Sequence, residues 1–212
     1  MDKTAKLLLQ HICNIAEDEG QAGYDHEGHI RKFSLILLEQ LQKYCPAYQL
    51  TKESCYMIAE ASAYHDIGKI SMRDEILMKA SRLTKDEYEY MKKHTQKGMQ
   101  LFDAILKELS PEDEDYPLIQ YCKEICLYHH ERFDGNGYPY GLKGDDIPIS
   151  AQVVGLANAY DSLLMEKIYK RAYTKEEAFN RIMEGECGVF SDMLLTIFSM
   201  KRMELEEALE KE

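Results

Sequence analysis

The feature that most constrains this chain is a set of metal-ligand residue types spread between positions 65 and 130. His65-Asp66 forms one pair, His94 stands alone, and His129-His130 forms a second pair. Neutral imidazoles and carboxylates bind divalent iron, manganese, zinc or nickel. A shared site would require a fold that brings these distant segments together. Any one of these histidines alone is typical of an ordinary core or surface position, whereas the combination predicts a metal centre.

Composition limits the functions that such a centre can serve. The chain has 212 residues, of which 45% are hydrophobic and 30% are charged, which is typical of one globular domain. The net charge of -12 argues against binding to a nucleic-acid polymer, because phosphate backbones need clustered Lys and Arg. A small phosphate substrate remains compatible with this charge, since bound metal ions supply positive charge locally.

Cysteine usage and hydropathy predict a cytoplasmic protein that does not enter the membrane. The six cysteines show no C-x-x-C spacing, the start of the chain does not resemble a signal peptide, and no apolar run has transmembrane length. Cys122 and Cys126 share one helix face, and we interpret them as core residues rather than metal or redox groups.

Helical periodicity and capping signals predict an all-α bundle with one long loop. Capping boxes begin at Thr84 and Thr174, and four glycines and two prolines between Phe133 and Pro148 predict a structured loop. We expect a single domain over 1–212, with an N-terminal helix in 1–24, a core over 25–200 and a charged helix end over 201–212. The predicted helices cover 4–18, 25–44, 51–66, 84–94, 95–109, 116–131, 150–164, 174–183 and a last helix opened by Ser191 or Asp192.

The ligand set is that of a dinuclear site with a bridging carboxylate. Asp66 is the natural bridge, with His65 on one metal and the remaining three histidines around the other. Two metals about 3.5–4 Å apart can clamp a phosphoryl group and lower the pKa of a bridging water so that it becomes hydroxide. Lys69, one turn beyond His65, is placed to reach a phosphate oxygen.

These motifs, taken in order, resemble those of the HD-GYP family, a branch of the HD-domain metal-dependent phosphohydrolases. The resemblance covers roughly residues 25 to 200. The matching segments are His65-Asp66-Ile67-Gly68-Lys69-Ile70, Leu83-Thr84, Met91-Lys92-Lys93-His94, His129 to Pro139 and Gly141 to Pro148. The resemblance implies an HD-type helical bundle and two or three divalent ions, with iron or manganese expected. It also implies hydrolysis of cyclic di-GMP.

Residue by residue, the resemblance implies metal ligation by His65, Asp66, His94, His129 and His130. It also implies phosphate contact from Lys69 and a substrate border formed by Gly137-Tyr138-Pro139, a loop that is also a candidate contact for signalling proteins. His29 matches the N-terminal histidine of the family, and Asp25 lies one turn before it, where a carboxylate for a third metal could sit. His26 and Glu27 are expected to point elsewhere on the helix.

The chain departs from the family pattern at one metal-ligand position. Where the family has Ala-Asp-x-x-Asp-Ala-Leu, this chain has Asn158 at the first acidic position, and a neutral amide is a weaker ligand than a carboxylate. Asp161, the second acidic position, is not the ligand in the family. A family Arg-Pro-Tyr is replaced by Lys167-Ile168-Tyr169, which leaves Lys167 and Lys170 as candidate phosphate contacts without a bidentate Arg.

Three functions therefore compete. The leading one is a cyclic di-GMP phosphodiesterase with activity that the Asn158 replacement reduces. The second is a degenerate module that binds metal or nucleotide and signals through protein partners, and the third is a hydrolase of another phosphate ester. Near the C-terminus, Met193, Leu194, Ile197 and Phe198 are interpreted as core residues or a homodimer face rather than a cofactor site.

Overall fold

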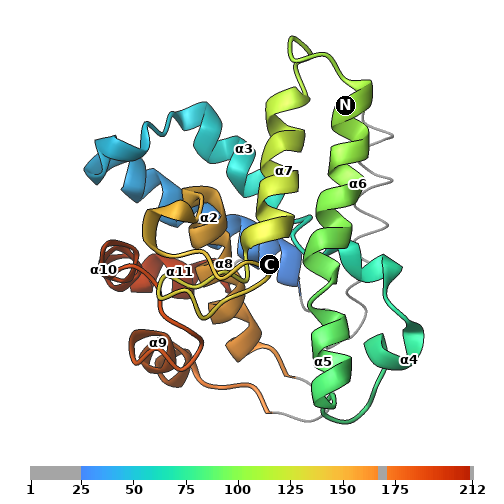
Figure 1. Ribbon diagram of the computed structural model, residues 1–212. Helices are drawn as coiled ribbons and strands as arrows, with labels where there is room; N and C mark the ends of the chain where they lie inside the picture. Colours follow the sequence, from blue (N-terminus) through green and yellow to red (C-terminus); the bar gives the residue numbers. More distant parts are fainter. Residues whose placement is uncertain (1–24, 167–170, 211–212) are drawn as a thin grey trace.

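The computed structural model describes residues 25–166 and 171–210, and these form an all-α bundle, as predicted (Figure 1). Within them no β-strand occurs, and Asp134 and Lys143 form only an isolated bridge. The helix predicted over 4–18 lies outside the described residues. The helices are α2 (His26–Tyr44), α3 (Lys52–Ser62), α4 (Asp74–Leu77), α5 (Lys85–Met91), α6 (His94–Glu108), α7 (Tyr116–Tyr128), α8 (Ile149–Leu164), α9 (Lys175–Met183), α10 (Asp192–Met200) and α11 (Arg202–Ala208), with short 3-10 turns η1 (Pro46–Tyr48), η2 (Ile67–Ser71) and η3 (Gly144–Asp146).

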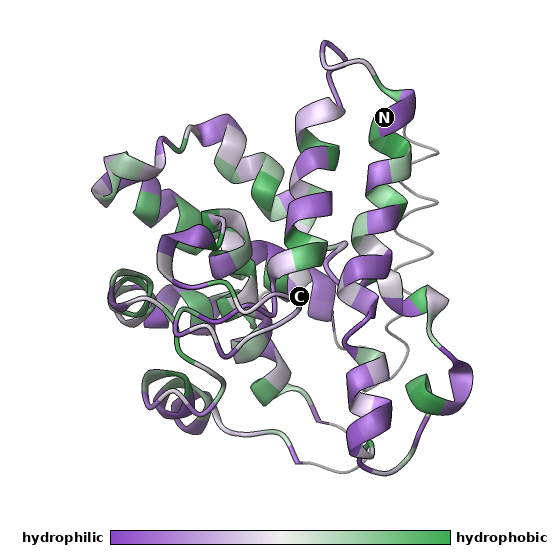
Figure 2. Ribbon diagram, viewed as in Figure 1, coloured by the Kyte–Doolittle hydropathy of each residue, from purple (hydrophilic) through white to green (hydrophobic). Residues whose placement is uncertain are grey.

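The bundle is built around α2 and α7. Helix α2 packs against α3, α8, α10 and α11, while α7 packs against α3, α6 and α8. Helices α6 and α7 run antiparallel beside each other (Figure 1). Hydrophobic and hydrophilic residues alternate around both helices, as expected when one face is buried and the other exposed (Figure 2). The centre of the core includes fully buried Phe33, Phe102, Tyr160 and Phe198.

The predicted capping boxes form. Thr84 accepts a hydrogen bond from the Glu87 N–H, and the Glu87 carboxylate accepts one from the Thr84 N–H. Thr174 and Glu177 make the same reciprocal pair at α9. Such caps stabilise a helix start by about 1 kcal/mol, because they satisfy amide groups that lack intrahelical partners. Their positions fix where α5 and α9 begin.

Four local predictions are wrong in detail. Helix α3 ends at Ser62 rather than at Asp66, and α7 ends at Tyr128 rather than at Glu131, so His65-Asp66 and His129-His130 both follow their helices. Ser150 was expected to cap the helix over 150–164, but Pro148 occupies the N-cap of α8 and the Ser150 hydroxyl donates to Glu124. The last predicted helix is interrupted at Lys201, which separates α10 from α11.

The described cysteines behave as core residues. Cys122 and Cys126 are buried, and the Cys126 thiol donates to the Tyr64 carbonyl at 3.1 Å, as the prediction of core packing requires. Burial also raises the pKa of the Cys122 thiol, which keeps it protonated. Separately, no helix in the described ranges combines the length and apolar character needed to cross a lipid bilayer.

Candidate metal centre

The predicted ligands lie at the ends of three elements that meet. His65 and Asp66 follow α3, His94 is the first residue of α6, and His129 is the residue directly after α7. Turn η2 packs against α6 so closely that a Cβ on Gly68 would lie 2.0 Å from the His94 carbonyl oxygen. Gly68 lies within this turn. Its backbone φ is not positive, so this close approach is the reason that only glycine fits.

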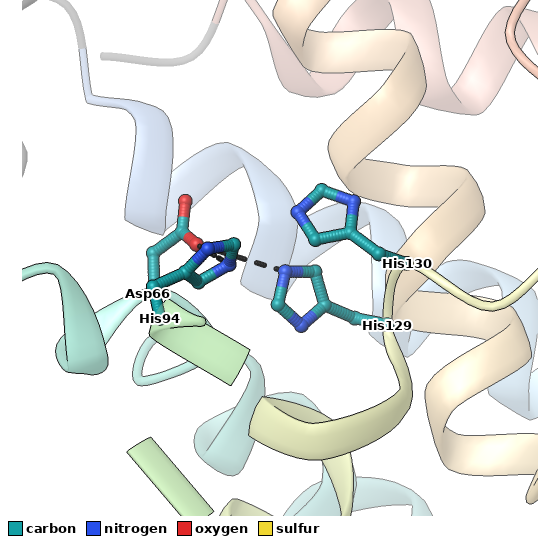
Figure 3. A group of neighbouring side chains, drawn as sticks. All are labelled: Asp66, His94, His129 and His130. Atoms are coloured by element: carbon teal, nitrogen blue, oxygen red, sulfur yellow. Dashed lines mark ion pairs between the residues drawn. The ribbon is translucent and has the colours of Figure 1, made fainter. Parts of the chain in front are cut away.

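Asp66 is the centre of the cluster. Its Oδ1 lies 3.0 Å from His94 Nε2 and 3.6 Å from His129 Nε2, while its Oδ2 lies 3.3 Å from His65 Nε2 and 2.9 Å from Lys69 Nζ. Figure 3 shows Asp66 and the rings of His94, His129 and His130 gathered around one space. One ligand atom from each of these four residues falls within 4.8 Å of the others. The carboxylate therefore faces different partners with its two oxygens, as a bridging ligand does.

The hydrogen bonds of three histidines fix which ring nitrogen faces Asp66. Nδ1 lies 3.0 Å from the Ser62 carbonyl in His65, 2.8 Å from the Met91 carbonyl in His94, and 2.9 Å from the Ile125 carbonyl in His129. A carbonyl oxygen only accepts, so each Nδ1 carries the proton and donates it. In a neutral imidazole the Nε2 atom then holds a lone pair. This backbone-held tautomer is the one that presents Nε2 to a metal.

Charge supports the same conclusion. Burial lowers the pKa of His129 to about 4, and burial together with His129 and His94 lowers that of His130 well below its ordinary value, so both are neutral at pH 7. Burial alone would raise the pKa of Asp66, but Lys69, His65 and His94 hold it well below its ordinary value. Lone pairs on His94 and His129 thus face an ionised carboxylate. A divalent cation between them converts this repulsion into coordination, so the donor set suits a metal ion.

A loop fastened by Glu131 covers one side of the centre. The buried Glu131 carboxylate accepts hydrogen bonds from the backbone N–H groups of Tyr140 at 2.8 Å and Leu142 at 3.0 Å. At Gly137 the loop lies so close to the backbone of Arg132 that a Cβ on Gly137 would be 2.3 Å from the Arg132 backbone nitrogen. These contacts place Tyr138 over His130, with ring centroids 4.5 Å apart and planes at 24°. The Tyr138-Pro139 bond is cis.

Two further contacts hold the end of α7. The Arg132 guanidinium donates to the Cys187 carbonyl at 3.0 Å and to the carbonyls of His129 and Glu131 at 3.1 and 2.8 Å. Helix α8 approaches so closely that a Cβ on Gly155 would lie 2.5 Å from the His129 carbonyl oxygen. Both contacts act on the backbone that carries the His129-His130 pair, and therefore on the direction of those rings.

A second group of polar side chains joins the start of α2 to α8. The buried Asp161 carboxylate pairs with Nδ1 of His26 through one oxygen and with Nδ1 of His29, at 3.1 Å, through the other. The His26 and His65 rings meet edge to face with centroids 5.7 Å apart. The expectation that His26 points elsewhere on the helix is therefore wrong. Asp161 was set aside because the family does not use it as a ligand, yet it contacts two imidazoles next to the cluster.

The remaining predicted site residues have different surroundings. Asn158 is buried, and its amide oxygen accepts a hydrogen bond from the Ser162 hydroxyl at 3.1 Å. Asp25 is exposed and caps α2 by accepting from the Gly28 N–H at 3.0 Å, a role that needs no metal. Lys167 and Lys170 lie outside the described residues.

Sequence reasoning missed three residues around the cluster. Glu131 and Arg132 act through backbone contacts that no motif spacing reveals. Lys92 is the third: its ammonium lies 5.4 Å from the centre of the Tyr138 ring and 2.7 Å from Glu89. Its place two residues before His94 was a signal that could have singled it out, because a cation there lies close to any ligand of the metals.

Comparison with known proteins places this geometry in a family. The HD domain family model matches residues 10–189. A Vibrio cholerae protein named "Probable cyclic di-GMP phosphodiesterase" is 33% identical over 93% of this chain and 44% of its own length. A second Vibrio cholerae protein, a 3'3'-cGAMP-specific phosphodiesterase, is 31% identical over 92% of this chain and 34% of its own length. A cyclic di-GMP phosphodiesterase from Thermotoga maritima is 36% identical over 72% of this chain and 39% of its own length.

The chain spans less than half the length of these relatives. The family model, in contrast, covers most of the chain, and it includes every histidine and the aspartate of the cluster. The helical fold, the Asp66-centred histidines and the Glu131-fastened loop follow the motifs that the sequence shares with the HD-GYP branch. The chain belongs to the HD domain family, and within it to the HD-GYP branch.

Proposed function

We propose that this chain is a metal-dependent phosphodiesterase that hydrolyses a cyclic dinucleotide, with cyclic di-GMP as the leading substrate. The observation that carries the proposal is the buried cluster of His94, His129 and His130 around Asp66, with Nε2 lone pairs of His94 and His129 directed at its carboxylate. Phosphodiester substrates are anionic, and an acidic chain needs local positive charge to bind them. The names of the relatives support the choice of a cyclic dinucleotide.

The proposed cofactor is a pair of divalent ions, iron or manganese, held by the residues on the two sides of Asp66. Bound ions of this kind polarise phosphoryl oxygens and lower the pKa of water, which supplies a nucleophile at neutral pH. His65 and Asp66 Oδ2 face one side, and Asp66 Oδ1 with His94, His129 and His130 faces the other. Neutral imidazoles suit either ion, because a protonated ring has no lone pair to offer.

Residues around the cluster bind and orient the substrate in this proposal. Lys69 pairs with Asp66 at 2.9 Å and keeps about a quarter of its side chain exposed, so its ammonium can turn to a phosphate oxygen. Tyr138 stacks on His130, and the Lys92 ammonium lies 5.4 Å from the centre of the Tyr138 ring. An aromatic face beside an ammonium suits a ligand that has both a base and a phosphate. Gly137 and Pro139 hold the Tyr138 backbone in place.

The test is turnover of cyclic di-GMP by the anaerobically prepared full chain loaded with iron or manganese. We expect a linear dinucleotide product from the native protein and none from His129→Ala at equal metal concentration. Asn158→Asp is measured in parallel, since a restored carboxylate should raise turnover if Asn158 limits it. Metal-loaded native protein that leaves cyclic di-GMP intact would contradict the proposal.

A second candidate substrate is 3'3'-cGAMP, which the name of one relative specifies. It differs from cyclic di-GMP in one base, so the metal cluster would treat its phosphates alike. The two substrates are distinguished by competition at equal concentrations, with the ratio of kcat/KM as the readout. Binding of either one without turnover would instead favour the degenerate signalling module.

A further inference from the structure

His26 and His29 differ from His65, His94 and His129 in the group that accepts their Nδ1 hydrogen bond. Both lie in the first turns of α2, and both direct Nδ1 to the same carboxylate, Asp161 on α8. The Asp161 side chain is fully buried, His29 is 3% exposed and His26 is 13% exposed. A carboxylate oxygen accepts, so each Nδ1 donates its proton. When the ring is neutral, its Nε2 atom carries a lone pair that faces away from Asp161.

A carboxylate behind an imidazole is the arrangement that prepares a histidine for a metal. It fixes the ring direction and raises the basicity of the distal nitrogen. In His65, His94 and His129 a backbone carbonyl has this function, with Nδ1 distances of 2.8–3.0 Å. Asp161 gives the same tautomer to two more rings, and it adds a negative charge that a carbonyl lacks. The hydrogen bonds of His26 and His29 therefore prepare their Nε2 atoms for a metal, as those of His65, His94 and His129 do.

The position of His26 relates it to one particular side of Asp66. Its ring meets the His65 ring at 5.7 Å, and His65 Nε2 lies 3.3 Å from Asp66 Oδ2. His94 and His129 lie instead against Oδ1. The His26 ring therefore lies beside the histidine on the Oδ2 side of Asp66.

We propose that His26 is a ligand of the metal position on the Oδ2 side of Asp66, and that Asp161 is the positioning residue that directs His26 and His29 to it. This inference rests on the proposed metal-dependent function and deepens it. It gives the Oδ2 position an imidazole ligand in a chain where the amide of Asn158 replaces a carboxylate of the family pattern. The competing interpretation is a protonated His26 whose ion pair with Asp161 only fastens α2 to α8.

The experiment is a cobalt(II) titration of the metal-free full chain, followed by visible absorption and by the metal content after gel filtration. The native protein is expected to bind two equivalents. His26→Gln keeps an amide able to donate to Asp161 but has no imidazole lone pair, so it should lose one equivalent. Asp161→Asn keeps an acceptor but no charge, and it should weaken the same equivalent by about 10- to 100-fold.

His94→Gln is the matched control, because it removes an imidazole from the Oδ1 side. It should lose the equivalent that His26→Gln retains, and the double variant should bind neither. X-ray absorption of the singly loaded variants counts the imidazoles on each cobalt. Melting temperatures of the metal-free proteins show whether each variant folds. If His26→Gln does not fold, Asp161→Asn provides a second test.

Two outcomes overturn the inference. If His26→Gln binds both equivalents as tightly as the native protein, His26 is no ligand, and a lowered melting temperature would then identify it as an ion-pair residue. If the native protein binds a single equivalent that His26→Gln leaves intact, the second position does not exist. Native protein that binds no cobalt at all would contradict the proposed function itself, which separates the two failures.

Discussion

The histidines around Asp66 fall into two groups that are held by different means. His65, His94 and His129 donate to carbonyls three or four residues earlier in the chain, so the backbone of each helix end sets the ring direction. His26 and His29 depend on Asp161, which lies 135 and 132 residues away in the sequence. The first group is thus oriented locally, whereas the second exists only once α2 and α8 have packed together.

This difference determines which substitutions disturb each group. A carbonyl cannot be removed by a side-chain substitution, so the first group is disturbed only by changes that move helix ends. The second group has a single carboxylate on which two rings depend. Asp66 contacts members of the first group directly. Its link to the second group runs through the His65 ring, which meets the ring of His26.

Asp66→Asn should disable both groups together. The amide removes the charge that neutralises the metals, and we expect loss of bound metal with turnover lower by at least about 10³-fold, because the ions supply several kcal/mol of transition-state stabilisation. Metal analysis and initial rates measure this. Asp103→Asn is the control, since Asp103 pairs with Lys107 and Lys123 on the outside of α6 and α7. Native metal content in Asp66→Asn would refute the bridging role.

Gly155→Ala should affect the first group and leave the second intact. The new methyl group would push against the His129 carbonyl, and we expect the free energy of unfolding to fall by about 1–3 kcal/mol. Metal affinity on the Oδ1 side should fall with it, as measured by urea denaturation and cobalt titration. Gly185→Ala is the matched control. A Cβ there meets no atom within 4 Å, so the positive φ costs roughly 1 kcal/mol without changing metal affinity.

Glu131→Gln should loosen the loop above the first group without releasing metal. One of the two loop N–H groups loses its acceptor, which should lower the free energy of unfolding by about 1–2 kcal/mol. The expected kinetic result is a raised KM with unchanged metal content. Asp134→Asn, on the exposed part of the same loop, should change little. Loss of metal in Glu131→Gln would instead show that the loop helps to hold the metal ligands in position.

Glu87→Gln should have the smallest effect, because α5 leads toward His94 without orienting it. Hydrogen bonds from Lys79 and Thr84 lower the pKa of Glu87 to about 2 from the ordinary 4.5. A lowered folded-state pKa stabilises the fold above the unfolded pKa and loses that effect as the pH falls. The stability difference between native and Glu87→Gln should therefore shrink between pH 4.5 and about 2. A stability difference that does not depend on pH would contradict this prediction. Metal affinity should be the same in both proteins.

The same contrast explains what the sequence could predict. Local signals placed α2, the capping boxes at Thr84 and Thr174, and the ligands at helix ends, because caps, periodicity and motif order are short-range properties. The cluster around Asp66 was expected from residue type and motif order. The hydrogen bonds of Glu131 and Arg132 were not, since they join segments through backbone groups that no sequence pattern marks.

The errors share a physical cause. His26 was judged from its own helix and Asp161 from the family pattern, yet their contact depends on how α2 packs on α8. Helix ends at Ser62 and Tyr128 were placed too late by a few residues, because a histidine pair looks the same inside a helix and just beyond it.

Anomalous diffraction from manganese-loaded crystals of the full chain would test whether Asp66 joins two metal positions. We predict one peak between Asp66 Oδ1 and the rings of His94, His129 and His130. A second peak is predicted beside Asp66 Oδ2, His65 and His26. Manganese bound elsewhere, with no peak at coordination distance from Asp66, would contradict the account.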